Sequence, residues 1–149
     1  MLRIPAGKAD DFGDLWVAGR SGFFMSENVS EALSLISTAQ ERLANIRKLA
    51  ALTGDARDEH DPDELNEAFR AVHSLAGVLP NDVKFSGHVL CNRLDDMRMA
   101  KLGLTAHNIN HVLAGLGLLA LRLERPEEVA LDAFSVMERE LAKLGRKVG

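Results

Sequence analysis

The chain has 149 residues, of which 46% are hydrophobic, and a formal net charge of −4. This length suits one domain with a single core, and the acidic balance argues against a nucleic-acid-binding protein, which needs a basic face. The only cysteine, Cys91, leaves no partner for an internal disulfide and favours a reducing compartment. We see no signal-peptide pattern, and the most apolar run, 112–121, is too short for a membrane span, so we expect a cytoplasmic protein.

The N-terminal part of the chain divides into a lead-in and a long helix. Residues 1–22 show no sustained period and predict a loosely structured segment, in which Trp16 either packs on the helices or belongs to a mobile tail. Asn28 followed by Glu31 predicts a helix start, and Gly54 predicts its end. Apolar residues spaced by four and three predict the buried face of this helix: Ala32, Ile36, Ala39, Leu43, Ile46 and Ala50.

A second helix is predicted between Asp61 and Pro80. Asp61 can cap it, Pro62 suits its first position, and Glu64 stands where a capping-box acid reaches back. Its predicted inward residues are Leu65, Phe69, Val72, Ala76 and Leu79. A neighbouring stripe holds Asn66, Arg70, His73 and Gly77, which puts His73 at the edge of the buried face with its ring able to reach water.

Three further helices are predicted after the turn at residues 80–82. The third carries Leu90, Leu94 and Met97 inward and ends at Gly103. Thr105 caps the fourth, whose apolar set is Ile109, Val112, Leu113, Leu116, Ala120 and Leu123. The fifth begins at Pro126, and its apolar set is Ala130, Ala133, Phe134, Met137, Leu141 and Leu144. No strand pattern competes, so the sequence predicts an all-α antiparallel bundle over residues 23–145.

The stretch Phe69-Arg70-Ala71-Val72-His73-Ser74-Leu75-Ala76-Gly77 resembles the active-site helix of histidine phosphotransfer (HPt) domains, most closely that of the chemotaxis kinase CheA. The family pattern His-x-x-Lys-Gly, with Phe-Arg upstream, is matched at His73, Gly77, Phe69 and Arg70, whereas Ala76 replaces the lysine. The resemblance implies an antiparallel four-helix bundle of HPt type with an additional fifth helix.

The resemblance also implies a phosphoryl carrier with His73 as phosphoacceptor. Counting from His73, Asp95 falls on a family glutamate and Asn92 on a family histidine, which together hold the imidazole, so we expect Asp95 to orient the ring. Arg70 is the expected cation beside the phosphoryl group, and Lys84 is a second candidate for that role.

The expected partners are a response-regulator receiver domain, a histidine kinase, or both. The partner supplies the phosphoryl group and the metal, so we expect no cofactor and no metal ligands in this chain. We also expect no ATP-binding domain. The chain is expected to be a monomer and to act as a phosphocarrier rather than as a turnover enzyme. Small residues around His73, namely Ala71, Ser74, Ala76 and Gly77, are expected to be exposed and to form the docking surface.

Three alternatives remain open at this level, and one of them is a structural helical protein whose match to the motif is chance. A non-catalytic adaptor of the same shape would bind a receiver or another signalling protein without accepting phosphate, in keeping with Ala76. Alternatively, the segment His107-Asn108-Ile109-Asn110-His111 is similar to the phosphoacceptor segment of sensor kinases, which would make the chain a dimerisation bundle that uses His107. His107 and His111 could also bind a metal, but a zinc site needs three or four ligands.

Overall fold

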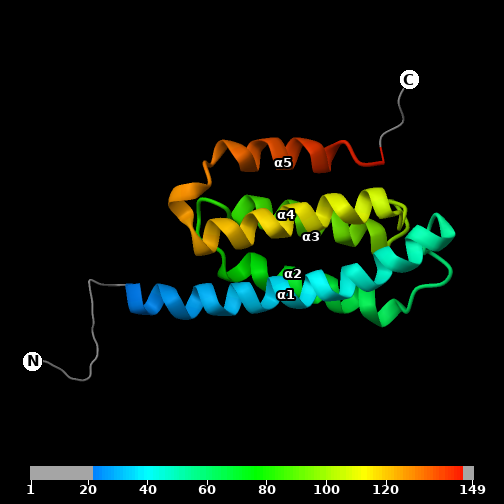
Figure 1. Cartoon of the computed structure of the whole chain (residues 1–149), viewed down its shortest axis with the longest axis horizontal. Coiled ribbons are helices and arrows are strands. Elements are labelled where there is room, and N and C mark those ends of the chain that lie inside the picture. Colours follow the sequence, from blue (N-terminus) through cyan, green and yellow to red (C-terminus); the bar gives the residue numbers. More distant parts are fainter. Residues whose placement is uncertain (1–21, 146–149) are drawn as a thin grey trace, which may run out of the picture. The chain divides into compact units, whose positions relative to one another are not determined.

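The computed structural model describes residues 22–145, with side chains from residue 28 onward, and this part of the chain is all-helical without strands (Figure 1). Its elements are α1 (Gly22–Thr53), α2 (Pro62–Val78), α3 (Lys84–Arg98), α4 (Ala106–Glu124), the 3₁₀ helix η1 (Pro126–Glu128) and α5 (Asp132–Ala142). The prediction of an all-α fold is therefore confirmed for the described residues. Of the lead-in predicted for residues 1–22, residues 1–21 with Trp16 lie outside them, and Gly22 already belongs to α1.

The chain separates into two compact units, Met1–Ala32 and Leu33–Gly149. The boundary falls inside α1, which begins at Gly22 rather than at Asn28, so the predicted helix start is wrong. Neither proline nor glycine stands between Phe23 and Asn28, so nothing in that stretch stops a helix.

The core of the second unit follows most of the predicted apolar stripes. In α1, Ile36, Ala39, Leu43, Ile46 and Ala50 are at most 2% exposed, as predicted. The prediction is less accurate in α2, where Phe69 is only half-buried while Ala68 and Leu75 are fully buried. Ala130 is exposed and Val129 is buried in its place, because the chain there forms a short 3₁₀ turn that changes the face presented to the core.

Two predicted helix boundaries are wrong for identifiable reasons. α3 ends at Arg98, well before Gly103, because Ala100 adopts a left-handed conformation with φ 62°. The amide of Lys101 then bonds the carbonyl oxygen of Asp96 at 2.8 Å, which closes the helix end as a glycine would. Pro126 starts only the three-residue η1, and α5 begins at Asp132.

The helices of this unit lie side by side. In Figure 1, α3 lies behind α4, and α5 runs along the opposite side of α4 from the α1 segment that follows Leu33. That segment is joined to α2 by Arg42, whose guanidinium contacts Glu64 at 3.3 Å and Glu67 at 2.9 Å, and to α4 by Arg47, which donates to Asn110 at 3.1 Å. The α3–α5 contact includes a 2.6 Å hydrogen bond from Ser86 to Glu138.

The loop between α1 and α2 is fixed to the end of α3 and the residues after it by hydrogen bonds, among them those of the Arg57 side chain. Arg57 donates two hydrogen bonds of 2.6 Å, to the carbonyl oxygens of Met97 and Leu102. The amide of Ala56 bonds the carbonyl oxygen of Leu104 at 2.9 Å. These bonds fix where α2 begins.

None of the helices described is long and apolar enough to cross a lipid bilayer.

Candidate functional site

His73 lies in the middle of α2 with its side chain exposed. The helix forms where the sequence predicts: Asp61 caps it by accepting from the amide of Asp63 at 3.0 Å, and Pro62 occupies its first turn. Val72 and Leu75, on either side of His73, are fully buried and set which face points outward. The histidine is therefore held on a rigid element and open to a partner.

The stripe that carries His73 is arranged as predicted. Arg70 and Gly77 are also exposed, one turn before and one turn after His73. A Cβ atom added at Gly77 would meet no heavy atom within 4 Å, so the space at this position, one turn after His73, is open. The expected docking surface is wrong in two members, however, because Ala71 and Ala76 are 7% and 3% exposed.

Two connections made by side chains of α3 fix how this helix runs past the stripe. At one end, Lys84 Nζ donates to the carbonyl oxygens of Ala76 at 3.1 Å and Gly77 at 3.3 Å. At the other end, Arg98 Nη1 donates to Asn66 Oδ1 at 3.2 Å. The helices are thus antiparallel neighbours, and His73 lies between the two connections.

Between these connections α2 and α3 approach closely, which explains the burial of Ala76. A Cβ atom added at Gly87 would lie 2.5 Å from Leu79 Cδ1 and 3.4 Å from Ala76 Cα. A lysine at position 76, as the family pattern has it, would have to be placed against α3 in this contact. The cation near the end of α2 comes instead from Lys84 on the neighbouring helix.

Asp95 is held by a different partner from the expected one. Its Oδ1 accepts from Arg98 Nη2 at 3.0 Å, and no hydrogen bond joins Asp95 to His73, both of which the structure describes in full. The Arg98 guanidinium also lies 4.0 Å from the centre of the Phe69 ring. The centroids of the Phe69 and His73 rings are 5.9 Å apart, and the ring planes are inclined to each other by 39°. Asp95 is therefore linked to His73 indirectly: it bonds Arg98, Arg98 lies over the Phe69 ring, and Phe69 lies near the histidine.

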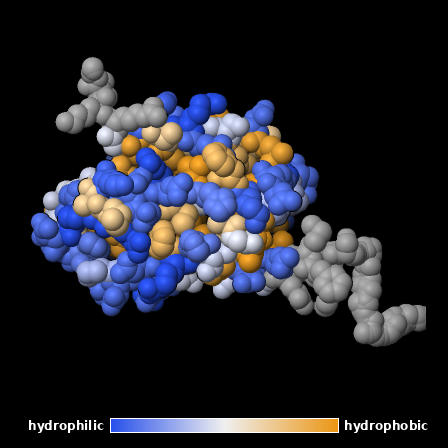
Figure 2. Space-filling model, turned by 180° about the vertical axis from the view of Figure 1, so that it is seen from behind, coloured by the Kyte–Doolittle hydropathy of each residue, from blue (hydrophilic) through white to orange (hydrophobic). Residues whose placement is uncertain are grey.

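The face seen from behind in Figure 2 is mostly hydrophilic, with hydrophobic patches between the polar residues.

On α3 the sequence interpretation missed one residue, His88, which is exposed and lies one turn after Lys84 and one turn before the exposed Asn92. The spacing of Lys84, His88 and Asn92 by four residues could have shown that they share a face. The helical spacing of Asp95 and Arg98 already allows their pairing, whereas the contacts of Arg98 with Asn66 and Phe69 depend on another helix.

Cys91 lies on the same helix but is only 8% exposed. Burial raises the pKa of the Cys91 thiol, the nearby carboxylate of Asp95 raises it further, and Arg98 offsets part of this effect. A thiol in such surroundings stays protonated, so it is a core residue rather than a nucleophile.

The second histidine segment lies on α4. Thr105 caps this helix, as predicted, by accepting from the amide of Asn108 at 3.1 Å. The His107 and His111 rings are 4.6 Å apart between centroids, and His111 Nδ1 lies 3.0 Å from the carbonyl oxygen of His107. Within the part of the chain that the structure describes, no group of three or more His, Cys, Asp or Glu side chains is placed to hold a metal ion.

Comparison of this chain with protein-family models and with curated protein sequences finds no match.

Proposed function

We propose that this chain is a histidine phosphotransfer protein of a two-component phosphorelay, built as an antiparallel four-helix bundle of HPt type with α5 as an additional helix. It carries a phosphoryl group on His73 in the cytoplasm between a kinase or receiver domain and a response regulator. The observation that supports this most strongly is the His73 ring, which is exposed at the middle of a well-capped helix beside open space at Gly77.

The reaction requires little from the chain itself. A lone pair on one imidazole nitrogen attacks the phosphorus of a phosphoaspartate, the P–O bond breaks, and its electrons stay on the departing carboxylate. The proton on the other ring nitrogen remains there, so the phosphorylated ring carries a positive charge until the reverse step passes the group on. The acceptor carboxylate and the metal ion belong to the partner domain, so this chain needs no pocket of its own at His73.

Two positioning contacts support the role of His73. Lys84 holds its ammonium group at the end of α2, one turn beyond His73, where it can offset the charge of an incoming phosphoryl group. Phe69 packs near the imidazole and is itself covered by Arg98, which Asp95 and Asn66 hold in place. Arg70 is on the same stripe and contributes a second positive charge.

The test is phosphotransfer from the phosphorylated receiver domains of the organism to the purified chain. Phosphohistidine is labile in acid and stable in base, so we expect a label with that behaviour on the natural protein. His73→Gln should abolish the label, and His107→Gln should keep it. Label that persists in His73→Gln and disappears in His107→Gln would contradict the assignment and support the kinase-like alternative.

A second candidate function is the non-catalytic adaptor. The observation in its favour is that Ala76 replaces the family's lysine at a buried position, while Asp95 makes no hydrogen bond with His73. This alternative predicts binding of a receiver domain with no label on the natural protein. Binding and transfer measured on the same receiver distinguish the two functions.

A further inference from the structure

Two histidines, His107 and His111, lie one helical turn apart near the start of α4. His107 is exposed and His111 is half-buried, so both rings can be reached from the solvent. The ring centroids are 4.6 Å apart, and the ring planes are inclined to each other by 60°. Imidazole is a ligand that suits copper, nickel and zinc ions, so the pair is a candidate for metal binding.

The separation of the two rings fits one shared metal ion. With a metal–nitrogen bond of about 2.0–2.1 Å, the centre of a bound imidazole ring lies about 3.2 Å from the metal. Two such rings have centres about 4.5 Å apart when they bind at a right angle, and about 5.2 Å apart at the tetrahedral angle. The observed separation of 4.6 Å is close to the right-angle value. That angle is typical of the tetragonal sites of Cu²⁺ and Ni²⁺ rather than of tetrahedral zinc.

One hydrogen bond decides which nitrogen of the His111 ring is free. Nδ1 of His111 lies 3.0 Å from the carbonyl oxygen of His107. A carbonyl oxygen can only accept, so Nδ1 carries the proton and Nε2 keeps a lone pair for a metal ion. Histidines that bind metals usually donate their other ring nitrogen to a carbonyl or carboxylate oxygen, and this bond orients the ring. His111 already makes the hydrogen bond expected of a metal ligand.

The backbone that carries the two rings is fixed by contacts at the start of α4. Thr105 caps the helix, and the side-chain amide of the buried Asn108 donates to the carbonyl oxygen of Gly103 at 2.9 Å. Ile109 and Val112, which lie between or beside the two histidines along the chain, are fully buried. This turn is ordered before an ion arrives, so metal binding costs little backbone entropy.

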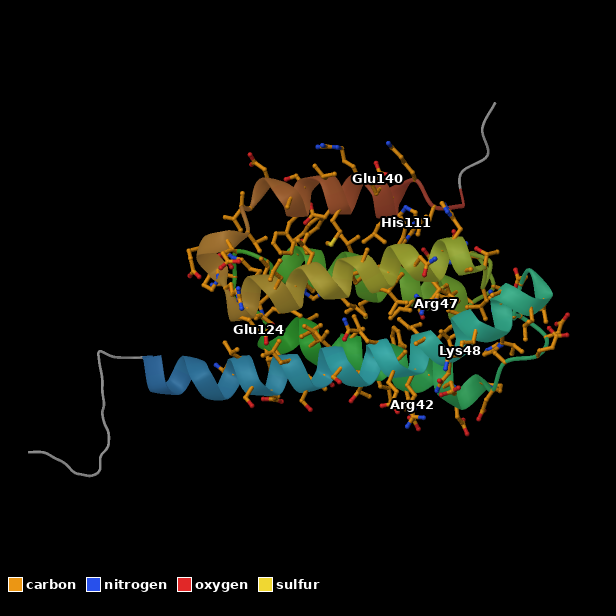
Figure 3. All side chains as sticks on the ribbon, in the orientation of Figure 1. Arg42, Arg47, Lys48, His111, Glu124 and Glu140 are labelled. Atoms are coloured by element: carbon orange, nitrogen blue, oxygen red, sulfur yellow. The ribbon has the colours of Figure 1, made fainter. Side chains whose placement is uncertain are left out.

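The surroundings of the pair leave the two histidines as the ligands that the chain supplies. His111 and Glu140 line the same cavity of about 280 Å³ between α4 and α5, and Figure 3 shows their side chains near each other. Glu140 pairs with Lys143 at 3.2 Å, so these two charges offset each other. Among the residues that the structure describes, no third His, Cys, Asp or Glu side chain completes a metal-binding group with the pair.

We propose that His107 and His111 form a binding site for a divalent late transition metal ion, and that Cu²⁺ binds most tightly. The two neutral imidazoles supply the protein ligands, and water completes the coordination. Affinities of nitrogen sites rise along the first row to Cu²⁺ and fall again at Zn²⁺, and a zinc site needs three or four protein ligands. The site differs from the expectation that the chain has no metal ligands. It is independent of the proposed function, because His73 belongs to α2.

The first test is calorimetric titration of the metal-free full chain, without an affinity tag, with CuCl₂. We expect one tight site with a dissociation constant in the micromolar range. His107→Gln and His111→Gln should each raise that constant at least roughly tenfold, because a single imidazole cannot chelate the ion. His88→Gln is the matched control: it removes an exposed histidine with no other histidine one turn away on α3, and it should leave the tight site unchanged. Circular dichroism of the metal-free variants checks that each remains helical.

Electron paramagnetic resonance of the natural chain loaded with one equivalent of Cu²⁺ identifies the ligands and needs no variant. We expect the spectrum of a tetragonal Cu²⁺ ion with two imidazole nitrogens. In the same calorimetric titration, Zn²⁺ should bind at least roughly tenfold more weakly than Cu²⁺. Equal Cu²⁺ affinity in the natural chain and in both folded variants, a spectrum with one imidazole nitrogen or none, or tighter binding of Zn²⁺ than of Cu²⁺ would each overturn the proposal.

Discussion

Lys84 donates a hydrogen bond of 3.1 Å from Nζ to the carbonyl oxygen of Ala76 and another of 3.3 Å to that of Gly77. The last carbonyl groups of a helix lack partners within the helix, and its C-terminal end attracts cations. The ammonium group is thus fixed beside the position where the family pattern has its own lysine. A contact between two helices, rather than the motif itself, places a positive charge at this end of α2.

Lys84→Met should slow phosphoryl transfer to His73. The site is exposed, so screening keeps the effect to about 1–2 kcal/mol, or roughly tenfold in rate. The measurement is the rate of label transfer from a phosphorylated receiver, with Lys101→Met as the control. If Lys84→Met leaves the rate unchanged while Arg70→Ala lowers it, Arg70 is the cation, as the sequence predicted.

Gly77→Arg should block partner docking with little effect on stability. Space beyond Gly77 is open, so the arginine side chain extends into the approach to His73 without a clash inside the protein. Receiver binding measured by titration calorimetry should fall below detection, whereas Gly77→Ala should bind normally. Normal binding by Gly77→Arg would place the docking surface elsewhere.

Gly87→Ala should destabilise the fold by about 1–2 kcal/mol, as added groups do in a packed core. The new methyl group would lie 2.5 Å from Leu79 Cδ1, so the buried Leu79 side chain would have to leave its present position. Urea unfolding measures the change. Gly77→Ala, at a helical glycine with open space, should instead be neutral or stabilise by up to about 1 kcal/mol. Equal stability of the two variants would show that the α2–α3 contact is loose.

Arg57→Ala should cost about 2 kcal/mol of unfolding free energy, because it removes two charge-assisted hydrogen bonds to the carbonyl oxygens of Met97 and Leu102. Arg125→Ala is the control, since its side chain is 63% exposed and its pairing with Glu128 is long, at 3.5 Å. That control should stay within about 0.5 kcal/mol of the natural protein. Similar losses in both variants would rule out a specific role for Arg57.

Cys91 gives a pH dependence with a defined sign. Burial raises the pKa of its thiol in the folded state, so the unfolded chain loses this proton first as the pH increases. The resulting contribution to stability is present below the unfolded pKa and is lost as the pH rises through the folded value. Urea unfolding at increasing alkaline pH should show this loss, and Cys91→Ala should lack it. Alkylation of the native thiol should also be slow until the chain unfolds.

The sequence by itself determined the helical class, the α2 start at Asp61, the Thr105 cap and the exposed position of His73. These features depend on residues within one or two turns of each other, so spacing and capping chemistry are enough to predict them. The same dependence on local sequence explains why the helix boundaries predicted at Asn28, Gly103 and Pro126 are wrong. In these places the observed backbone does not follow the local signal, most clearly where Ala100 closes α3 in a left-handed conformation.

Only the tertiary structure decided which side chains surround His73. Lys84 reaches the end of α2, Arg98 covers Phe69, and Asp95 pairs with Arg98 rather than with the histidine. It also showed what covers Ala76, which the apolar stripe predicts to face inward: the absence of a side chain at Gly87 lets α3 pack against it. Each of these contacts depends on the register between two helices. That register is set by packing across the core, which no spacing within a single helix encodes.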